Sequence, residues 1–253
     1  MAAGQGFTIG AMRPVEYDQC VDIACDAFMT DNPAVVALKI PREVWRDFVK
    51  AHVSRQSAVD TGLSLIARGE YGNPLAFLFL HAFDIRDQPP DEVFQQHEGL
   101  QCMKEMIEKL YERAMTSPVK GLRLASLLSG KALYAAMGGT FPDASGQGLG
   151  KALRLRAVEV AKERGFSTLL VEPGHGATRH IWTQHCHGVI RAEMAFRSFK
   201  SKGGQYPLKD VDGTISICEV VIHKSFADSA FFWPLSFAKL IWLTTCAKPR
   251  RAA

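Results

Sequence analysis

The sequence contains no C-x-x-C pair, no internal repeat and no low-complexity segment, and its N-terminus lacks the apolar stretch of a secretory signal. Its six cysteines are scattered along 253 residues, at positions 20, 25, 102, 186, 218 and 246. This spacing argues against a disulfide framework and favours free thiols in a reducing compartment, where cysteines are often buried as small hydrophobic side chains. We therefore expect a cytoplasmic protein.

The chain also lacks a strong charge of either sign. The net charge is only +4 at pH 7, whereas nucleic-acid-binding domains usually show a clustered basic face. We therefore expect no nucleic-acid partner, although a mild positive charge is compatible with an anionic cofactor. The hydrophobic content of 47% is that of a globular protein with a core, and the length suits one domain with or without an appendage.

The most informative stretch is TFPDASGQGLGKAL, residues 140–153. An apolar run, residues 132–140, precedes it and reads as a strand, and a long helical run follows it. Strand, glycine loop and helix N-terminus together form a geometry that holds phosphates, because the first amides of a helix have no partner within it and lie at the positive end of its dipole. Glycine lets these amides approach an anion closely, and Lys151 adds a charge.

Two common phosphate-binding motifs do not fit this loop. In the Walker loop, Gly150-Lys151 would be followed by Ser or Thr, but Ala152 removes that hydroxyl, and Ser145 occupies the position of the first glycine. In the dinucleotide fingerprint G-x-G-x-x-G, Gly146 and Gly148 fit, but Lys151 occupies the third glycine position. A loop that merely joins a strand to a helix is the remaining structural alternative.

The loop resembles the acetyl-CoA loop of the GNAT acetyltransferases, Arg/Gln-x-x-Gly-x-Gly/Ala, through Gly148 and Gly150. Members of that superfamily commonly read Val-x-Pro-x-x-Arg-Gly-x-Gly-Ile-Gly before a Leu-rich helix, and this chain departs from the pattern at Thr140 and Ser145. The resemblance implies an α/β fold with a mixed, mostly antiparallel central sheet flanked by helices. It also implies acetyl-CoA as co-substrate.

The order of elements along the chain agrees with this fold. Helical spacing of apolar residues predicts helices over residues 16–29, 41–55, 92–115 and 153–164. Apolar and alternating runs predict strands over residues 7–12, 63–68, 75–83, 132–140, 168–171, 191–199 and 214–224. The run 75–83 is apolar almost throughout and should be a central strand, in which His81 is expected to be a hydrogen-bonded core residue.

The resemblance also assigns the cofactor-binding residues. GNAT strands splay apart near the glycine loop, which would place the acetyl carbonyl near the backbone of Met137 and Gly138. The expected cofactor-binding residues are Met137, Gly138, Gly139, Thr140, Ser145, Gly146, Gln147, Gly148, Leu149, Gly150 and Lys151.

The residues for proton transfer are less clear. Asp31-Asn32-Pro33 resembles the Asp-Glu-Pro segment of insect arylalkylamine N-acetyltransferases, in which the glutamate is the general base, but that position is Asn32 here. Asp31 is therefore one candidate base, with a helix-ending turn as its structural alternative. The tyrosine that protonates the departing thiolate in the family corresponds to Gln184, which is not an acid.

A cluster of imidazoles and a thiol follows the strand at 168–171: His175, His180, His185, Cys186 and His187. Their spacing does not place them on one helix face, as the i, i+4 pair of a zinc motif would be, so we expect no metal. Scattered surface histidines are the structural alternative. His175 is the second catalytic candidate, because it lies just beyond a strand end and imidazole titrates near neutral pH.

The last segment lies beyond the predicted domain. We expect residues 1–226 to form the N-acetyltransferase domain and residues 227–253 to form a C-terminal apolar and basic extension. The apolar run 231–247 contains Pro234 and one lysine and is short for a membrane span, which needs roughly 20 apolar residues. A helix packed on the domain, an interfacial helix touching a membrane surface, and a span are the alternatives.

The sequence thus predicts an acetyl-CoA-dependent N-acetyltransferase that acts on a primary amine of a small molecule. The alternative is a non-catalytic acyl-CoA-binding module with the same fold, with or without membrane contact, because both family positions for acid and base are replaced at Asn32 and Gln184.

Overall fold

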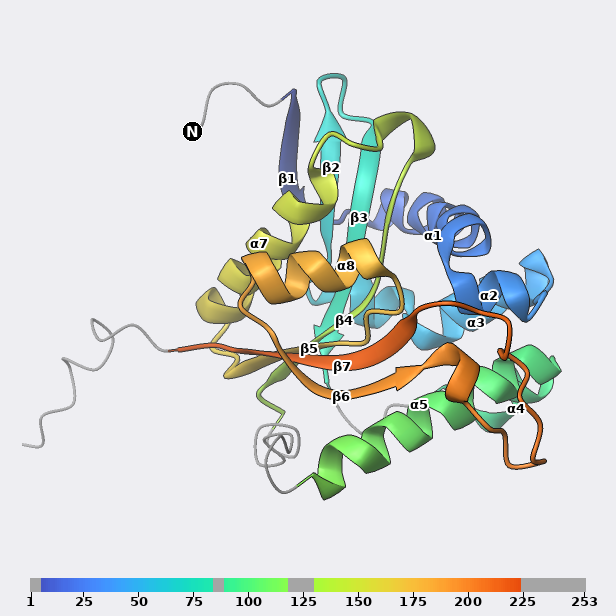
Figure 1. Ribbon diagram of the computed structural model, residues 1–253. Helices are drawn as coiled ribbons and strands as arrows, with labels where there is room; N and C mark the ends of the chain where they lie inside the picture. Colours follow the sequence, from blue (N-terminus) through green and yellow to red (C-terminus); the bar gives the residue numbers. More distant parts are fainter. Residues whose placement is uncertain (1–5, 84–88, 118–129, 224–253) are drawn as a thin grey trace, which may run out of the picture. The chain divides into compact units, whose positions relative to one another are not determined.

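The computed structural model describes residues 6–83, 89–117 and 130–223. Seven strands form one sheet in the order β1-β2-β3-β4-β5-β7-β6 (Figure 1). All neighbouring strands are antiparallel except β4 and β5, which run parallel. The strands are β1 (Phe7–Ala11), β2 (Leu65–Gly69), β3 (Pro74–Ala82), β4 (Ala132–Thr140), β5 (Thr168–Val171), β6 (Val189–Ala195) and β7 (Thr214–Val221).

The helices lie between these strands in the chain. The α-helices are α1 (Tyr17–Asp31), α2 (Pro33–Ala37), α3 (Arg42–His52), α4 (Asp91–Gln95), α5 (Glu98–Thr116), α7 (Leu149–Glu163) and α8 (Gly176–His180). Short 3-10 turns are η1 (Pro14–Glu16), η3 (Pro142–Ala144) and η5 (Phe196–Ser198), and π-helical turns are η2 (Gln56–Asp60) and η4 (Ile181–His185).

Helices cover both faces of the sheet, and the alternation of side chains along β3 shows how. Phe77 and Phe79 point to one face, where they pack in a core with residues of α1 and α3. Leu78 and Leu80 point to the other face, where α7 covers them. Helix α5 packs on the first face against β6 and β7. Strand β3 is therefore buried on both faces, as its apolar sequence predicts.

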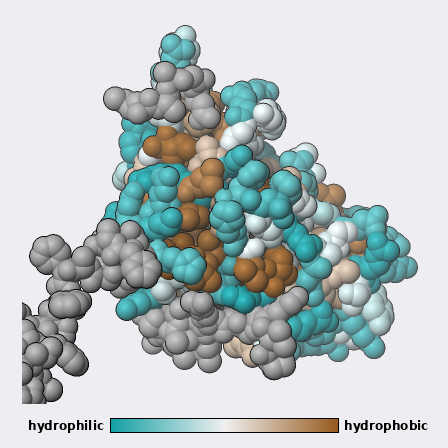
Figure 2. Space-filling view, turned by 60° about the vertical axis from the view of Figure 1, so that its left-hand side comes forward, coloured by the Kyte–Doolittle hydropathy of each residue, from teal (hydrophilic) through white to brown (hydrophobic). Residues whose placement is uncertain are grey.

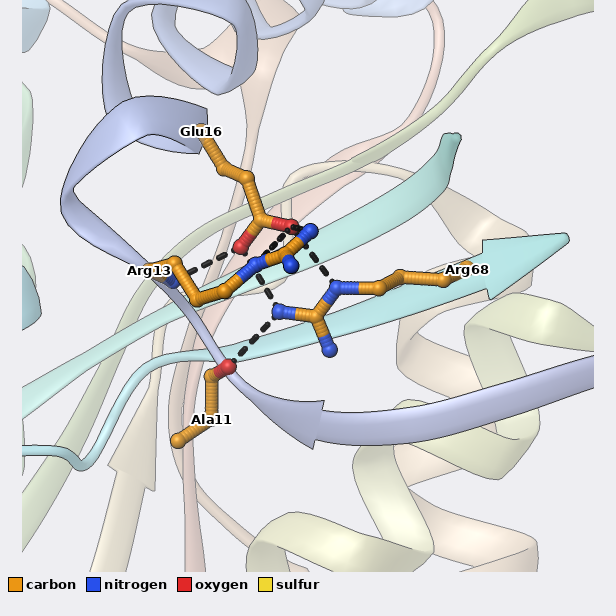
Figure 3. A network of polar contacts seen from close by, with 4 residues as sticks. All are labelled: Ala11, Arg13, Glu16 and Arg68. Carbon is orange, nitrogen blue, oxygen red and sulfur yellow. Dashed lines mark hydrogen bonds and ion pairs between the residues drawn. The ribbon is translucent and has the colours of Figure 1, made fainter. Parts of the chain in front are cut away.

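A buried carboxylate joins the start of α1 to the first two strands (Figure 3). Glu16 is 3% exposed and accepts hydrogen bonds from Arg68 Nε and Nη2, both at 2.7 Å, and from the backbone N–H of Arg13 at 2.7 Å. Arg68 on β2 also donates to the carbonyl of Ala11 on β1 at 2.8 Å. Although burial raises the pKa of Glu16, the hydrogen bonds from Arg68 and Arg13 outweigh it and lower that pKa to about 2.

The surface carries hydrophobic side chains between hydrophilic ones. On the face shown in Figure 2, the hydrophobic residues form a broken band flanked by hydrophilic residues. In the part of the chain that the structure describes, no helix is both long and apolar enough to cross a membrane.

Cys20, Cys25, Cys102, Cys186 and Cys218 are free and buried, as the sequence predicts.

The predicted α/β architecture, a mixed and mostly antiparallel sheet flanked by helices, is confirmed. The helix expected over residues 92–115 is instead two helices, because His97 interrupts it and its Nδ1 accepts a hydrogen bond from the N–H of Gly99 at 3.0 Å. Helix α2 was not expected: Asn32 ends α1 but also caps α2. The C-terminal extension, residues 227–253, lies outside the described residues.

Candidate active site

Strands β4 and β5 separate in the middle of the sheet. They pair only over four positions, from Ala132 opposite Thr168 to Ala135 opposite Val171. Strand β5 ends there, whereas β4 continues to Thr140. Ala136 is an extra residue in β4, because Leu80 pairs with Ala135 and the next residue back, Phe79, pairs with Met137. A bulge of this kind bends the strand, and it marks the point at which the sheet opens.

The glycine loop lies between β4 and α7 and is open to solvent. Gly148 caps α7 in the left-handed conformation, with φ of 77°, and Gly146 has φ of 78°, so both positions favour glycine. A Cβ atom added at either glycine would meet nothing within 4 Å. Within the described residues, no side chain caps the first turn of α7. The loop therefore fits an anion, because exposed amides and the positive end of a helix dipole meet in free space.

A buried cation lies behind this loop. Arg154 on α7 is 9% exposed, and its Nη1 donates to the carbonyl of Gly150 at 2.8 Å. Its Nη2 is 3.5 Å from the hydroxyl of Thr178 on α8, and its guanidinium lies 5.8 Å from the ring centre of Trp182. Burial lowers the pKa of Arg154 to about 10, so the group is still a cation at neutral pH. None of the ion pairs among the described residues involves Arg154, and its Nε has no hydrogen-bond partner there.

On the opposite face of the sheet, a cavity of about 460 Å³ opens beside β4. This volume is typical of sites for small molecules. Its lining is mainly aromatic and aliphatic and includes Ala136 and Met137, at the opening of the sheet. Large apolar lining residues come from α1, α3, α4, α5, β7 and the residues that directly follow β3 and β6: Phe28, Phe48, Phe83, Phe94, Met103, Met106, Ile107, Phe196 and Ile215.

One carboxylate lies among these apolar side chains. Glu172 directly follows β5 and lines the cavity. Its Oε1 accepts a hydrogen bond from the hydroxyl of Tyr111 on α5 at 2.7 Å, and its Oε2 accepts one from Tyr134 on β4 at 2.9 Å. Burial raises the pKa of Glu172, and the two tyrosine hydrogen bonds oppose that shift. The same burial, together with the nearby carboxylate, raises the pKa of both tyrosines well above 10.

Two histidines border this group. The ring of His52 stacks on Phe48 with centroids 5.4 Å apart and meets Tyr134 edge-on at 6.0 Å. The ring of His81 meets Tyr134 edge-on at 5.2 Å. Burial, reinforced by His81, lowers the pKa of His52 to about 4, so this imidazole is neutral at pH 7.

The chain resembles known proteins in structure rather than in sequence. No family model matches it, and no curated protein matches it significantly in sequence. Solved structures do match. The C-terminal condensation domain of Ebony in complex with β-alanyl-dopamine superposes with a TM-score of 0.70 at 15% identity, over 85% of this chain and 99% of that one. Arylalkylamine N-acetyltransferase 2 from Aedes aegypti gives 0.67 at 14% identity, over 87% and 100%.

This chain has the GNAT fold. A third structure, the polyamine N-acetyltransferase of Drosophila melanogaster, agrees with a TM-score of 0.57 at 14% identity, over 85% of this chain and 99% of that one. Identities this low establish the fold only.

The GNAT fold brings part of the predicted cofactor site together. Met137 lines the cavity at the opening of the sheet. Gly138 and Gly139 are closely packed, because an added Cβ would lie 3.0 Å from Leu78 Cδ1 at Gly138 and 2.8 Å from Phe77 Cε1 at Gly139. Thr140 ends β4, and the remaining predicted residues, from Ser145 to Lys151, form the loop and first turn of α7.

The two predicted catalytic residues lie elsewhere on the GNAT fold. Asp31 is exposed at the last position of α1, and the next residue, Asn32, lines the cavity while its Oδ1 accepts hydrogen bonds from Ala34 N and Val35 N at 3.1 and 3.2 Å. His175 is exposed and caps α8, with its Nδ1 accepting from Ala177 N at 3.3 Å. Neither Asp31 nor His175 is among the described residues that line the cavity.

The histidine cluster that follows β5 is spread over α8 and η4. The rings of His180 and His185 are 5.6 Å apart and edge-on, whereas Cys186 is buried. Among the residues that the structure describes, no three His, Cys, Asp or Glu side chains come together as metal ligands.

Sequence analysis missed Glu172, Tyr111 and Tyr134. Glu172 is 61 positions from Tyr111 and 38 positions from Tyr134 in the sequence, so no local pattern joins them. The one available signal was a glutamate directly after a buried strand, at an end that faces the opening of the sheet.

Proposed function

We propose that this protein transfers an acetyl group from acetyl-CoA to the primary amine of a small molecule. One observation carries the proposal: an open helix N-terminus at Gly148 and an apolar cavity lie on opposite faces of the sheet. The cavity borders the opening at Ala136 and Met137, and from the other face Arg154 of α7 comes within 3.8 Å of a Cβ added at Gly138. Two reactants that enter from opposite faces could meet there and react without diffusing through solvent.

The residues of the loop suit the co-substrate. The uncapped amides from Gly148 to Lys151 would bind the diphosphate of CoA, and the cations of Lys151 and Arg154 lie on the same helix. A backbone N–H near Met137 or Gly138 would stabilise negative charge on the acetyl oxygen during the transfer. When bound, acetyl-CoA supplies the activated thioester, and the chain supplies position, charge and exclusion of water.

The cavity suits the acceptor. Its aromatic and aliphatic walls would bind the apolar body of an amine, as expected for a small arylalkylamine-type acceptor. The similar structures support an amine, since their names include arylalkylamine and polyamine N-acetyltransferases.

Calorimetry with acetyl-CoA and a panel of amines tests the proposal, with release of free CoA as the measure of turnover. We expect Gly148→Asp to weaken acetyl-CoA binding at least 100-fold, because it places a carboxylate where the diphosphate would bind. Gly148→Asn is the matched control, because the asparagine side chain has the shape of aspartate, tolerates the left-handed conformation and carries no charge.

Three results are informative. Turnover by the wild-type protein together with loss of binding in Gly148→Asp supports the proposal. Binding of acetyl-CoA without turnover on any amine favours the non-catalytic acyl-CoA-binding module. Equal acetyl-CoA affinity in Gly148→Asp and Gly148→Asn would rule out this loop as the diphosphate site.

A further inference from the structure

We propose that Glu172 is the acceptor's binding partner and proton acceptor: its carboxylate pairs with the ammonium group of the amine and takes one of its protons, while Tyr111 and Tyr134 position it. This inference rests on the proposed acetyl transfer and assigns the acceptor half of that site. Four observations support it: the place of Glu172 in the sheet, its charge, its hydrogen bonds and its neighbours.

The register of the sheet places Glu172 at the opening. Val171 is opposite Ala135 in the parallel pair, so Glu172 is level with Ala136, the bulge residue of β4. Neighbouring strands lie about 4.8 Å apart where they pair. The carboxylate, Ala136 and Met137 all line one cavity. An amine held by Glu172 would therefore have its nitrogen close to the backbone where the acetyl group is proposed to lie.

The charge of Glu172 has no cationic partner among the described residues. None of the ion pairs among the described residues includes it. The other two acids that line the cavity, Asp91 and Glu108, are each within ion-pair distance of Lys104, and Glu108 also of Lys202. A partly buried carboxylate without a cation is unfavourable, and a ligand ammonium would offset that cost.

The hydrogen bonds of Glu172 leave room for a ligand. An ionised carboxylate offers about four lone-pair sites, and the hydroxyls of Tyr111 and Tyr134 occupy one on each oxygen. The tyrosines come from α5 and β4, so they hold the carboxylate from two sides. An ammonium group could donate to the remaining sites without displacing either hydroxyl.

Glu172 is the carboxylate that the two tyrosines hold, and its other described neighbours have different surroundings. The described titratable groups that face it are Tyr111 on α5 and Tyr134 on β4, with His52 on α3 and His81 on β3 behind Tyr134. Both tyrosines keep their protons at neutral pH, and both His52 and His81 lie against the Tyr134 ring. Lys104, Asp91 and Glu108 form their own cluster.

The proposed step balances. The ammonium R–NH3+ gives one proton to the Glu172 carboxylate and becomes R–NH2. Its nitrogen then forms a bond to the acetyl carbonyl carbon, and the carbon–sulfur bond breaks with its electron pair on sulfur. The nitrogen then loses a second proton, and the thiolate sulfur takes up a proton to give the CoA thiol. Glu172 returns its own proton to solvent. The sum is amine as ammonium plus acetyl-CoA giving acetamide, CoA thiol and one proton.

The test uses the full chain with 2-phenylethylamine and acetyl-CoA. We expect Glu172→Gln to lower kcat/KM at least 100-fold, which is the usual contribution of a positioned base, while acetyl-CoA affinity stays within twofold. The control is Glu112→Gln, the same chemical change on an exposed residue next to Tyr111, with wild-type kinetics expected. The unfolding temperature of Glu172→Gln should equal or exceed that of the wild type, because a neutral amide replaces a partly buried carboxylate.

Tyr111→Phe and Tyr134→Phe test the positioning role. Each removes a hydrogen bond that favours the ionised carboxylate, so the acid limb of the kcat/KM profile should shift to higher pH. If a tyrosine had only a structural role, its replacement would change the free energy of unfolding but not the acid limb of the kcat/KM profile. The exposed Tyr71→Phe is the control and should leave the profile unchanged.

Amine binding separates this inference from the proposed function. Calorimetry of 2-phenylethylamine in two buffers measures affinity and proton transfer without turnover, and Glu172→Gln should bind at least tenfold more weakly. If the wild type binds the amine through Glu172 but does not acetylate it, the acetyl transfer fails and the acceptor site stands. Wild-type kcat/KM and amine affinity in Glu172→Gln would overturn the inference. The inference would also be overturned if Asp31→Asn or His175→Ala lost kcat/KM and amine affinity to this extent while Glu172→Gln did not.

Discussion

At the residue scale, Arg154 shows how a buried cation can be held in place without an anionic partner among the described residues. Its guanidinium lies beside the positive end of α7 and has one short hydrogen bond, to the Gly150 carbonyl. A cation at a helix N-terminus is unfavourable, and so is a buried charge without an anion. Both costs would fall if an anion bound at the loop.

We therefore predict that Arg154→Met raises the stability of the free protein but weakens acetyl-CoA binding. Replacing a buried charge by an apolar side chain of similar size should increase the free energy of unfolding by about 1 kcal/mol or more, measured by urea denaturation. Acetyl-CoA affinity, measured by calorimetry, should fall about tenfold.

Arg156→Met is the control for this prediction. Arg156 is on the same helix but pairs at the surface with Glu159 and Glu163. Its loss should reduce stability by less than about 1 kcal/mol and leave acetyl-CoA affinity unchanged. A large loss of stability in Arg154→Met with unchanged affinity would mean that Arg154 only supports the packing of α7 and α8.

At the scale of elements, the Glu16 network joins η1 and α1 to the edge of the sheet. Removing one partner of a buried ion pair leaves the others unpaired, so Glu16→Gln should lower the free energy of unfolding by about 3 kcal/mol at pH 7. The lowered pKa of Glu16 means that this stabilisation is present above the unfolded value of 4.5 and is lost as pH falls towards about 2.

Urea denaturation from pH 7 to pH 2 measures this difference. The difference in the free energy of unfolding between the wild type and Glu16→Gln should be constant near neutral pH and should become smaller below pH 4.5. Glu43→Gln, an exposed change on α3, is the control. A gap that does not depend on pH would show that the hydrogen bonds of Glu16 do not require its charge.

The sequence predicted those elements whose signals are local. Strands β4 and β5 have the predicted bounds, because an apolar run ends at glycines or at a loop in each case. The structure differs from the prediction where one side chain has two roles. The sequence predicts that a helix ends at Asn32, yet the Asn32 Oδ1 also caps the N-terminus of α2. The cavity at Glu172 was not predicted, because Tyr111, Tyr134 and Glu172 meet only through tertiary packing.

At the scale of the whole molecule, the described domain places its two proposed binding sites on opposite faces of one sheet. A ligand that binds only the folded state stabilises it by about 2.7 kcal/mol at 100 times its dissociation constant. We predict that acetyl-CoA raises the thermal unfolding midpoint of the wild type, whereas Gly148→Asp shows no shift at the same concentration. A wild-type midpoint unchanged by acetyl-CoA would contradict the proposed loop site.

The short pairing of β4 with β5 has a mechanical consequence. Four residue pairs are the whole seam between a half-sheet of β1 to β4 and a half-sheet of β5, β7 and β6. The seam is also the parallel joint of the sheet, and parallel pairing is slightly weaker for each residue than antiparallel pairing. A reactant bound between the separated strands would contact both half-sheets, so the proposed co-substrate would also hold the two halves together.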